Sequence, residues 1–132
     1  MTEGTDNALL ERFEQDIWSK VPHLEEGSET RVVNATPLVD MTADFKECAK
    51  TVFKLDLDNA DLKVFGKMDS TLLTGSIKVR PAANIINDAI VTGKLRSGQT
   101  VIEATSGNFG IALGLLSKLG LNVIALVSRK LQ

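Results

Sequence analysis

The pattern of apolar and polar positions predicts a helix near the start of the chain. Leu10, Phe13 and Ile17 recur at helical spacing within residues 7–20, and Asp6 can cap the first turn. The apolar face of such a helix must be covered by something. We expect it to pack on its own domain, with docking on another subunit as the alternative.

The following segments are less regular. Residues 23–30 are polar and contain Gly27, as is typical of a linker. Residues 36–39 are expected to be extended, whereas the periodicity of residues 48–57 is compatible with a strand or a helix. The chain therefore divides into an N-terminal helix and linker, residues 1–30, and a main region, residues 31–132.

The pattern sharpens from residue 62 onward. It predicts a strand, a helix, a strand, a helix and a strand over residues 62–68, 80–92, 100–104, 107–119 and 121–127. This alternation is typical of a parallel sheet with right-handed crossovers. The predicted fold class is α/β, with a parallel sheet and flanking helices.

Two loops follow predicted strands and should therefore meet. Ligands of open parallel sheets bind beyond the carboxyl ends of the strands, so residues 74–81 and 105–110 should share one edge. The second loop offers hydroxyls, an amide and backbone N–H groups at a helix start, which suit a carboxylate or another anion. Thr-Ser-Gly-Asn is also a routine turn, and Lys78 alone would be a routine surface charge. Only the two loops together indicate a site.

Composition narrows the classes of partner. The net charge is −2 and the 15 basic residues are scattered, so no nucleic-acid or anionic-membrane footprint is visible. The longest clean apolar stretch, Val123 to Val127, is far shorter than the roughly 20 residues of a membrane span. Cys48 is the single cysteine, and the polar, acidic N-terminus is unlike a signal peptide. We expect a cytoplasmic protein without internal disulfides or a metal site.

Three segments resemble the fold-type II pyridoxal-phosphate (PLP) enzymes, the family of cysteine synthase and cystathionine β-synthase. TGSIKVRPAANIINDA resembles the segment of the Schiff-base lysine, GKLRSGQTVIEATSGNFGIALG the strand and substrate-carboxylate loop, and NATPLVDM the early Thr-Pro-Leu segment. The resemblance covers about residues 32–127 and implies a three-layer αβα fold. The spacing of the glycines differs from the dinucleotide fingerprint Gly-x-Gly-x-x-Gly, which disfavours NAD binding.

The resemblance also implies roles for individual residues. Lys78 would form the Schiff base with PLP and then transfer protons, and Asn108 would hydrogen-bond the ring hydroxyl of the cofactor. The substrate carboxylate would be held by Thr105, Ser106, Gly107, Asn108 and Phe109. A lysine must lose its proton to attack an aldehyde, and partial burial beside cationic groups favours the neutral amine. We therefore expect Lys78 to be partly buried.

Three positions depart from the family pattern. Val79 stands where relatives usually have an aspartate, and Leu72-Leu73 stands where Asn-Pro is common. Phe109 replaces a hydroxyl residue, which removes a donor from the carboxylate grip and adds bulk there.

The resemblance implies β-elimination or β-replacement on a serine-like amino acid, which is lyase or transferase chemistry of amino-acid biosynthesis. The family's phosphate-binding loop and the group facing the pyridine nitrogen come later in the chain than Gln132. We therefore expect a fragment, or one chain of a split enzyme completed by another polypeptide or a homo-oligomer. The alternative is a non-catalytic interaction or regulatory protein that retains the lysine half of the fold. A nucleotide-binding module would rest on fold analogy alone.

Overall fold

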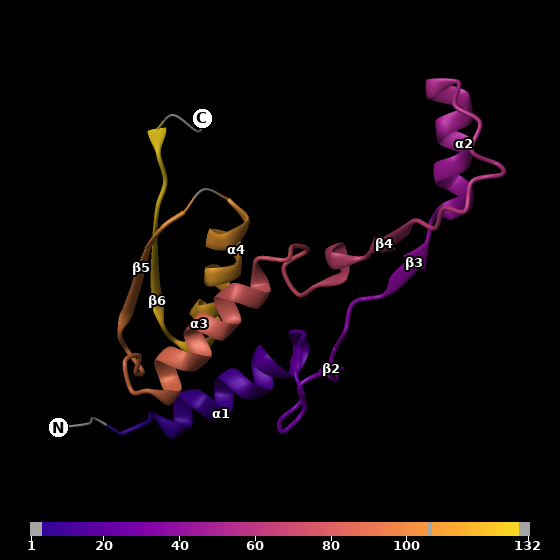
Figure 1. Cartoon of the computed structure of the whole chain (residues 1–132). Coiled ribbons are helices and arrows are strands. Elements are labelled where there is room, and N and C mark those ends of the chain that lie inside the picture. Colours follow the sequence, from indigo (N-terminus) through magenta and orange to yellow (C-terminus); the bar gives the residue numbers. More distant parts are fainter. Residues whose placement is uncertain (1–3, 106, 130–132) are drawn as a thin grey trace. The chain divides into compact units, whose positions relative to one another are not determined.

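The computed structural model describes residues 4–105 and 107–129, which form two compact units (Figure 1). Unit 1 contains the described residues of 1–35 and 70–132, and unit 2 is Thr36–Asp69. In this described part, no helix is both long and apolar enough to cross a membrane.

Unit 1 holds most of the regular structure. Its elements are α1 (Asn7–Asp16), η1 (Trp18–Lys20), β1 (His23–Leu24), β2 (Val32–Val33), α3 (Val79–Val91), β5 (Thr100–Ala104), α4 (Asn108–Gly114), η3 (Leu115–Leu119) and β6 (Asn122–Leu126). The strands β1 and β2 pair antiparallel. The strands β5 and β6 pair in parallel, from Thr100 opposite Asn122 to Ala104 opposite Leu126, and α4 and η3 make the crossover between them. The predicted α/β class is confirmed.

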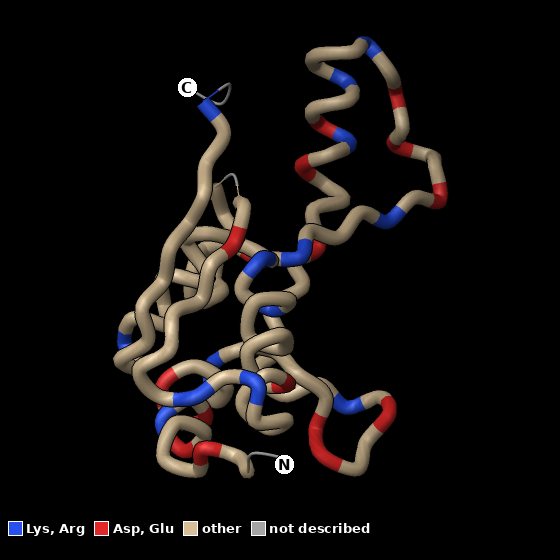
Figure 2. Tube along the Cα trace, turned by 90° about the vertical axis from the view of Figure 1, so that its left-hand side faces the viewer, with Lys and Arg blue, Asp and Glu red and all other residues tan. Residues whose placement is uncertain are grey.

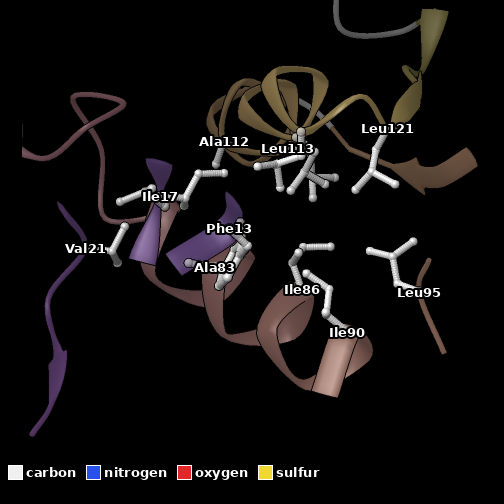
Figure 3. Close-up of a cluster of buried hydrophobic side chains, with 14 of the residues drawn as sticks. Phe13, Ile17, Val21, Ala83, Ile86, Ile90, Leu95, Ala112, Leu113 and Leu121 are labelled. Carbon is white, nitrogen blue, oxygen red and sulfur yellow. The ribbon is translucent and has the colours of Figure 1, made fainter. Parts of the chain in front are cut away.

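The core of unit 1 is built where α1, α3, α4 and η3 meet. Phe13 and Ile90 are fully buried, and Figure 3 shows Phe13 of α1 beside Ala83 of α3. The expectation that the first helix packs on its own domain is confirmed, because Leu9, Phe13 and Ile17 all belong to this core. Leu10, which the sequence pattern placed on the buried face, is only partly buried.

The two faces of the β5–β6 pair differ in burial. Val101 and Val123 are paired neighbours that pack against the core, so this face lies toward the helices. On the opposite face Ile102 and Ile124, also paired, are exposed. The described helices of unit 1 therefore cover one face of this sheet.

A glycine permits α4 to lie close to the end of β5. An added Cβ at Gly110 would stand 2.8 Å from Cγ2 of Thr105 and 3.9 Å from Cβ of Ala125. Contacts under 3 Å are not tolerated without movement, so a side chain at this position would displace the helix or the strand end. Gly114 in the same helix has no such neighbour within 4 Å.

Asp6 ties the start of α1 to the turn that precedes β5. One carboxylate oxygen accepts from the backbone N–H of Leu9 at 3.0 Å, and the other accepts from that of Ser97 at 2.9 Å. These backbone donors, Ser97 foremost, hold the pKa of the Asp6 carboxyl below its ordinary value of 3.8. The predicted helix cap is confirmed.

Unit 2 is a hairpin that carries a helix. It contains β3 (Leu38–Asp40), α2 (Thr42–Phe53) and β4 (Phe65–Lys67), and its last residue begins η2 (Asp69–Thr71). The Thr36 hydroxyl donates to an Asp69 carboxylate oxygen at 3.0 Å, which joins the two ends of the unit. The ambiguous residues 48–57 are helical as far as Phe53, and Lys54 ends the helix in the left-handed conformation.

One strand prediction is wrong. Residues 62–68 were expected to join the parallel sheet, but β4 is shorter and pairs antiparallel with β3, from Leu38 opposite Lys67 to Asp40 opposite Phe65. Alternation along a strand shows that the segment is extended, but it does not identify the strand with which the backbone pairs.

We predict opposite responses to alanine at the two glycines of α4. Gly114→Ala should raise the free energy of unfolding by about 0.5–1 kcal/mol, because alanine removes the entropic cost of glycine in a helix. Gly110→Ala gains the same propensity but meets Thr105, and it should be at least about 1 kcal/mol less stable than Gly114→Ala. Urea unfolding of both variants measures the difference, and equal stabilisation by both would contradict the close approach.

We also predict that Asp6 contributes to acid sensitivity. Its pKa is lower in the folded chain than in the unfolded chain, so its stabilisation is present above about pH 4 and is lost as the pH falls through the folded value. Asp6→Asn should therefore reduce stability at pH 7 and weaken the loss of stability on acidification, measured by urea unfolding at pH 7 and pH 3.

The control is Asp16→Asn at the other end of α1, where the backbone carbonyl and not the carboxylate accepts from Lys20. This change should leave stability at pH 7 unchanged or slightly raised, because a carboxylate opposes the dipole at a helix C-terminus. A pH dependence altered equally by both variants would contradict the role given to Asp6.

Candidate functional site

Lys78 is the N-cap residue directly before α3, and its side chain is exposed. Its backbone carbonyl accepts from Ala82 N at 3.2 Å, and its N–H donates to Ser76 Oγ at 3.3 Å. The next residue, Val79, is 1% exposed and belongs to the core. Val79 thus anchors the helix start in the core, while the amine of Lys78 stays accessible. This packing explains why Val79 is apolar at a position where the resemblance led us to expect aspartate.

The segment before Lys78 turns through a glycine. Gly75 has a φ of 68°, which favours glycine, and its N–H donates to Leu72 O at 2.7 Å. Leu72 is buried in the core, whereas Leu73 is exposed. The two leucines in place of Asn-Pro therefore fix one end of a turn that leads into Ser76 and Lys78. Gly75 is a positioning residue that the sequence reasoning did not single out, although a glycine next to the lysine segment is a signal for such a turn.

The second loop begins where β5 ends. Thr105 is partly buried, and its N–H donates to Leu126 O of β6 at 3.0 Å, which fixes the loop on the sheet. Gly107 has a φ of 106°, and Asn108 is exposed at the first position of α4. Ser106 lies outside the described residues.

Phe109 directs part of its side chain toward the interior. It is partly buried and packs against the core cluster. The core thus accommodates part of the bulk that was expected beside the substrate carboxylate. The group at this position that could donate to an anion is the backbone N–H. It lies in the first turn of a helix, where backbone N–H groups lack intrahelical partners.

The structure brings the two loops to neighbouring helices of one unit. The helices α3 and α4 pack together, through buried residues that include Ala83, Ala112 and Leu113. Both helices begin at the end of unit 1 where β5 also ends (Figure 1). The prediction that the two loops share one edge relied on residues 62–68 as a strand of the parallel sheet, and that strand prediction is wrong. Both loops nevertheless belong to unit 1.

The expected partial burial of Lys78 is not found. The side chain is exposed, so the described residues do not desolvate the ammonium group. Lys and Arg are interspersed with Asp and Glu along the trace, and no long run of one sign is seen (Figure 2). Any further shielding of Lys78 must come from what binds beside it.

Comparison with known proteins identifies the family. The profile of the family described as "Pyridoxal-phosphate dependent enzyme" matches residues 30–132. The chain is 37% identical over 86 residues to a cysteine synthase of Aquifex aeolicus, which is 65% of this chain and 24% of that protein. It is 37% identical over 75 residues to the N-(2-amino-2-carboxyethyl)-L-glutamate synthase of Ralstonia nicotianae, 56% of this chain and 22% of that protein.

A third relative matches a shorter segment more closely. Cysteine synthase B of Pseudomonas aeruginosa is 49% identical over 49 residues, 37% of this chain and 16% of the relative. The matched segments thus span about a quarter or less of these three relatives. The profile match over residues 30–132 shows that the chain belongs to the family of pyridoxal-phosphate dependent enzymes, whose cofactor is pyridoxal 5′-phosphate.

Proposed function

We propose that this chain is the lysine-bearing part of an enzyme that catalyses β-elimination or β-replacement on a serine-like amino acid. Lys78 is the residue to which PLP attaches. The observation that supports this most directly is the placement of Lys78 and Asn108 at the starts of two packed helices in one unit.

The residues present fit the cofactor in their chemistry. An exposed primary amine, an exposed amide and a partly buried hydroxyl are available from Lys78, Asn108 and Thr105. When bound, PLP supplies an electron sink for the negative charge that develops at the substrate α-carbon. The protein then has to bind, orient and move protons.

Each residue has a distinct task in this proposal. The Lys78 Nζ attaches the cofactor and later takes and returns the proton at the substrate α-carbon. The Asn108 amide would donate to the ring hydroxyl oxygen of the cofactor. Thr105 Oγ1, Ser106 and the backbone N–H groups of Gly107 to Phe109 hold the substrate carboxylate, with the positive φ of Gly107 shaping the loop.

The names of two relatives support the reaction class. Cysteine and N-(2-amino-2-carboxyethyl)-L-glutamate both contain a 2-amino-2-carboxyethyl group, bonded to sulfur in one and to nitrogen in the other. Both products follow if a leaving group is lost from the β-carbon of a serine-like donor and a nucleophile then adds there. Serine, O-acetylserine and O-phosphoserine are donors of this kind, and the nucleophile is open between sulfide and an amine.

A completing polypeptide belongs to this proposal. The matched segments are about a quarter or less of the three relatives described, and no group for the cofactor phosphate is assigned within the described residues. We infer that the phosphate-binding loop is supplied by further polypeptide, which also shields Lys78 from water.

Borohydride trapping tests the role of Lys78. The chain is incubated with PLP, reduced, digested and analysed by mass spectrometry, which locates any cofactor bonded to a lysine. We expect the label on Lys78 and a visible absorption band before reduction. Lys78→Ala should lose both almost entirely, because no other amine occupies this loop.

Lys118→Ala is the matched control, since Lys118 is another exposed lysine of unit 1. It should keep both the label and the band. Label spread evenly over the lysines, or persisting in Lys78→Ala, would refute the assignment and favour a non-catalytic interaction protein.

A further inference from the structure

Thr105, directly after β5, carries a hydroxyl that is not used inside the described part of the chain. Within residues 4–105 and 107–129, no hydrogen bond to Thr105 Oγ1 is formed, and the residue is only partly buried. Another threonine hydroxyl of unit 1, that of Thr92, donates to Asp88 O at 2.6 Å. The Thr105 hydroxyl is therefore available to a ligand, and no internal hydrogen bond sets its direction.

The methyl group of Thr105 lies against Gly110 of α4. An added Cβ at Gly110 would stand 2.8 Å from Thr105 Cγ2 but 3.7 Å from Oγ1. A separation under 3 Å requires movement, whereas 3.7 Å is an ordinary van der Waals contact. The missing side chain at Gly110 thus leaves room for the methyl group, and the hydroxyl oxygen lies farther from this position.

Backbone conformation does not explain the glycine at position 110. Gly107 has a φ of 106°, which favours glycine, but Gly110 lies within α4, where alanine is the better helix former. Gly114 of the same helix has no neighbour within 4 Å. The close approach of Thr105 is therefore the physical reason for a glycine at position 110.

The methyl and the hydroxyl of a threonine move together. Both are bonded to one Cβ, and χ1 of a β-branched residue occupies only a few staggered rotamers. The Thr105 N–H is bonded to Leu126 O, and α4 is held by its own buried residues, so the Thr105 side chain is the part of the strand end that moves most easily. A side chain at position 110 that displaced the methyl would therefore also displace the hydroxyl.

We propose that Gly110 is a positioning residue for the substrate carboxylate and acts through the rotamer of Thr105. Gly110 lets the Thr105 methyl pack against α4, and this contact holds Oγ1 in the orientation from which it donates to the carboxylate. The inference rests on the proposed function, which gives Thr105 the task of holding that group. Gly110 itself does not have to touch the substrate.

NMR spectroscopy tests the contact without cofactor. Three-bond couplings from the Thr105 methyl carbon to the backbone nitrogen and carbonyl carbon report χ1 in the isotope-labelled 132-residue chain. We expect a single rotamer in the unsubstituted chain and in Gly114→Ala, and a different or averaged rotamer in Gly110→Ala. An unchanged rotamer in Gly110→Ala would overturn the proposal.

Ligand titration tests the consequence for the carboxylate. The PLP-loaded chain is titrated with L-alanine, which has a carboxylate but no β-leaving group, and with ethylamine, which lacks the carboxylate. The shift of the visible absorption band gives each affinity. Gly110→Ala should weaken L-alanine binding by at least about tenfold, the loss expected of one hydrogen bond to a charged group, and leave ethylamine binding unchanged. A purely structural defect would weaken both.

A double variant supplies the rescue. Serine keeps the hydroxyl of Thr105 but lacks the methyl that an alanine at position 110 would meet, and the alanine Cβ then occupies the vacated space. Gly110→Ala combined with Thr105→Ser should therefore regain most of the L-alanine affinity that Gly110→Ala loses, which makes the two substitutions strongly non-additive. Gly114→Ala is the matched control and should bind L-alanine like the unsubstituted chain, because no atom lies within 4 Å of its added Cβ.

Equal weakening of L-alanine and ethylamine binding, or no recovery in the double variant, would also overturn the proposal. So would an unsubstituted, PLP-loaded chain that binds L-alanine no better than ethylamine, because Thr105 would then hold no carboxylate. Failure of the two proposals is distinguishable, because borohydride labelling of Lys78 reads the proposed function and the Thr105 rotamer is read in the chain without cofactor.

Discussion

The packing of α3 against α4 in the core of unit 1 is the interaction on which the candidate site depends. Val79 is buried at the start of α3, and Ala112 and Leu113 are buried in α4. Burial of these residues fixes the two helices against each other, and the exposed residues Lys78 and Asn108 lie at their starts. A buried residue beside an exposed one combines a fixed backbone with an accessible side chain.

The same core includes a helix that lies outside the family match. The α1 helix spans residues 7–16, before the matched region begins at residue 30, yet Phe13 is fully buried against α3. The Asp6 carboxylate, at the start of this helix, accepts a hydrogen bond from the backbone N–H of Ser97, in the turn before β5. The N-terminal segment therefore stabilises the framework that carries both loops.

The two faces of the β5–β6 pair differ in how they are covered. The described helices cover its inner face, and Gly110 allows α4 to approach Thr105 and Ala125 closely. Its outer face is apolar and exposed, which is costly in water for three large side chains.

The sequence by itself determined the local elements and the family. Spacing of apolar residues predicted α1, α3, β5 and β6 closely, because each element buries one regular stripe, and the lysine and Thr-Ser-Gly-Asn segments pointed to PLP. Only the tertiary structure decided that β4 pairs with β3, that Phe109 packs against the core and that Lys78 is exposed. The physical reason is that periodicity records which face of an element is buried, whereas strand partners and exposure depend on contacts between residues far apart in the chain.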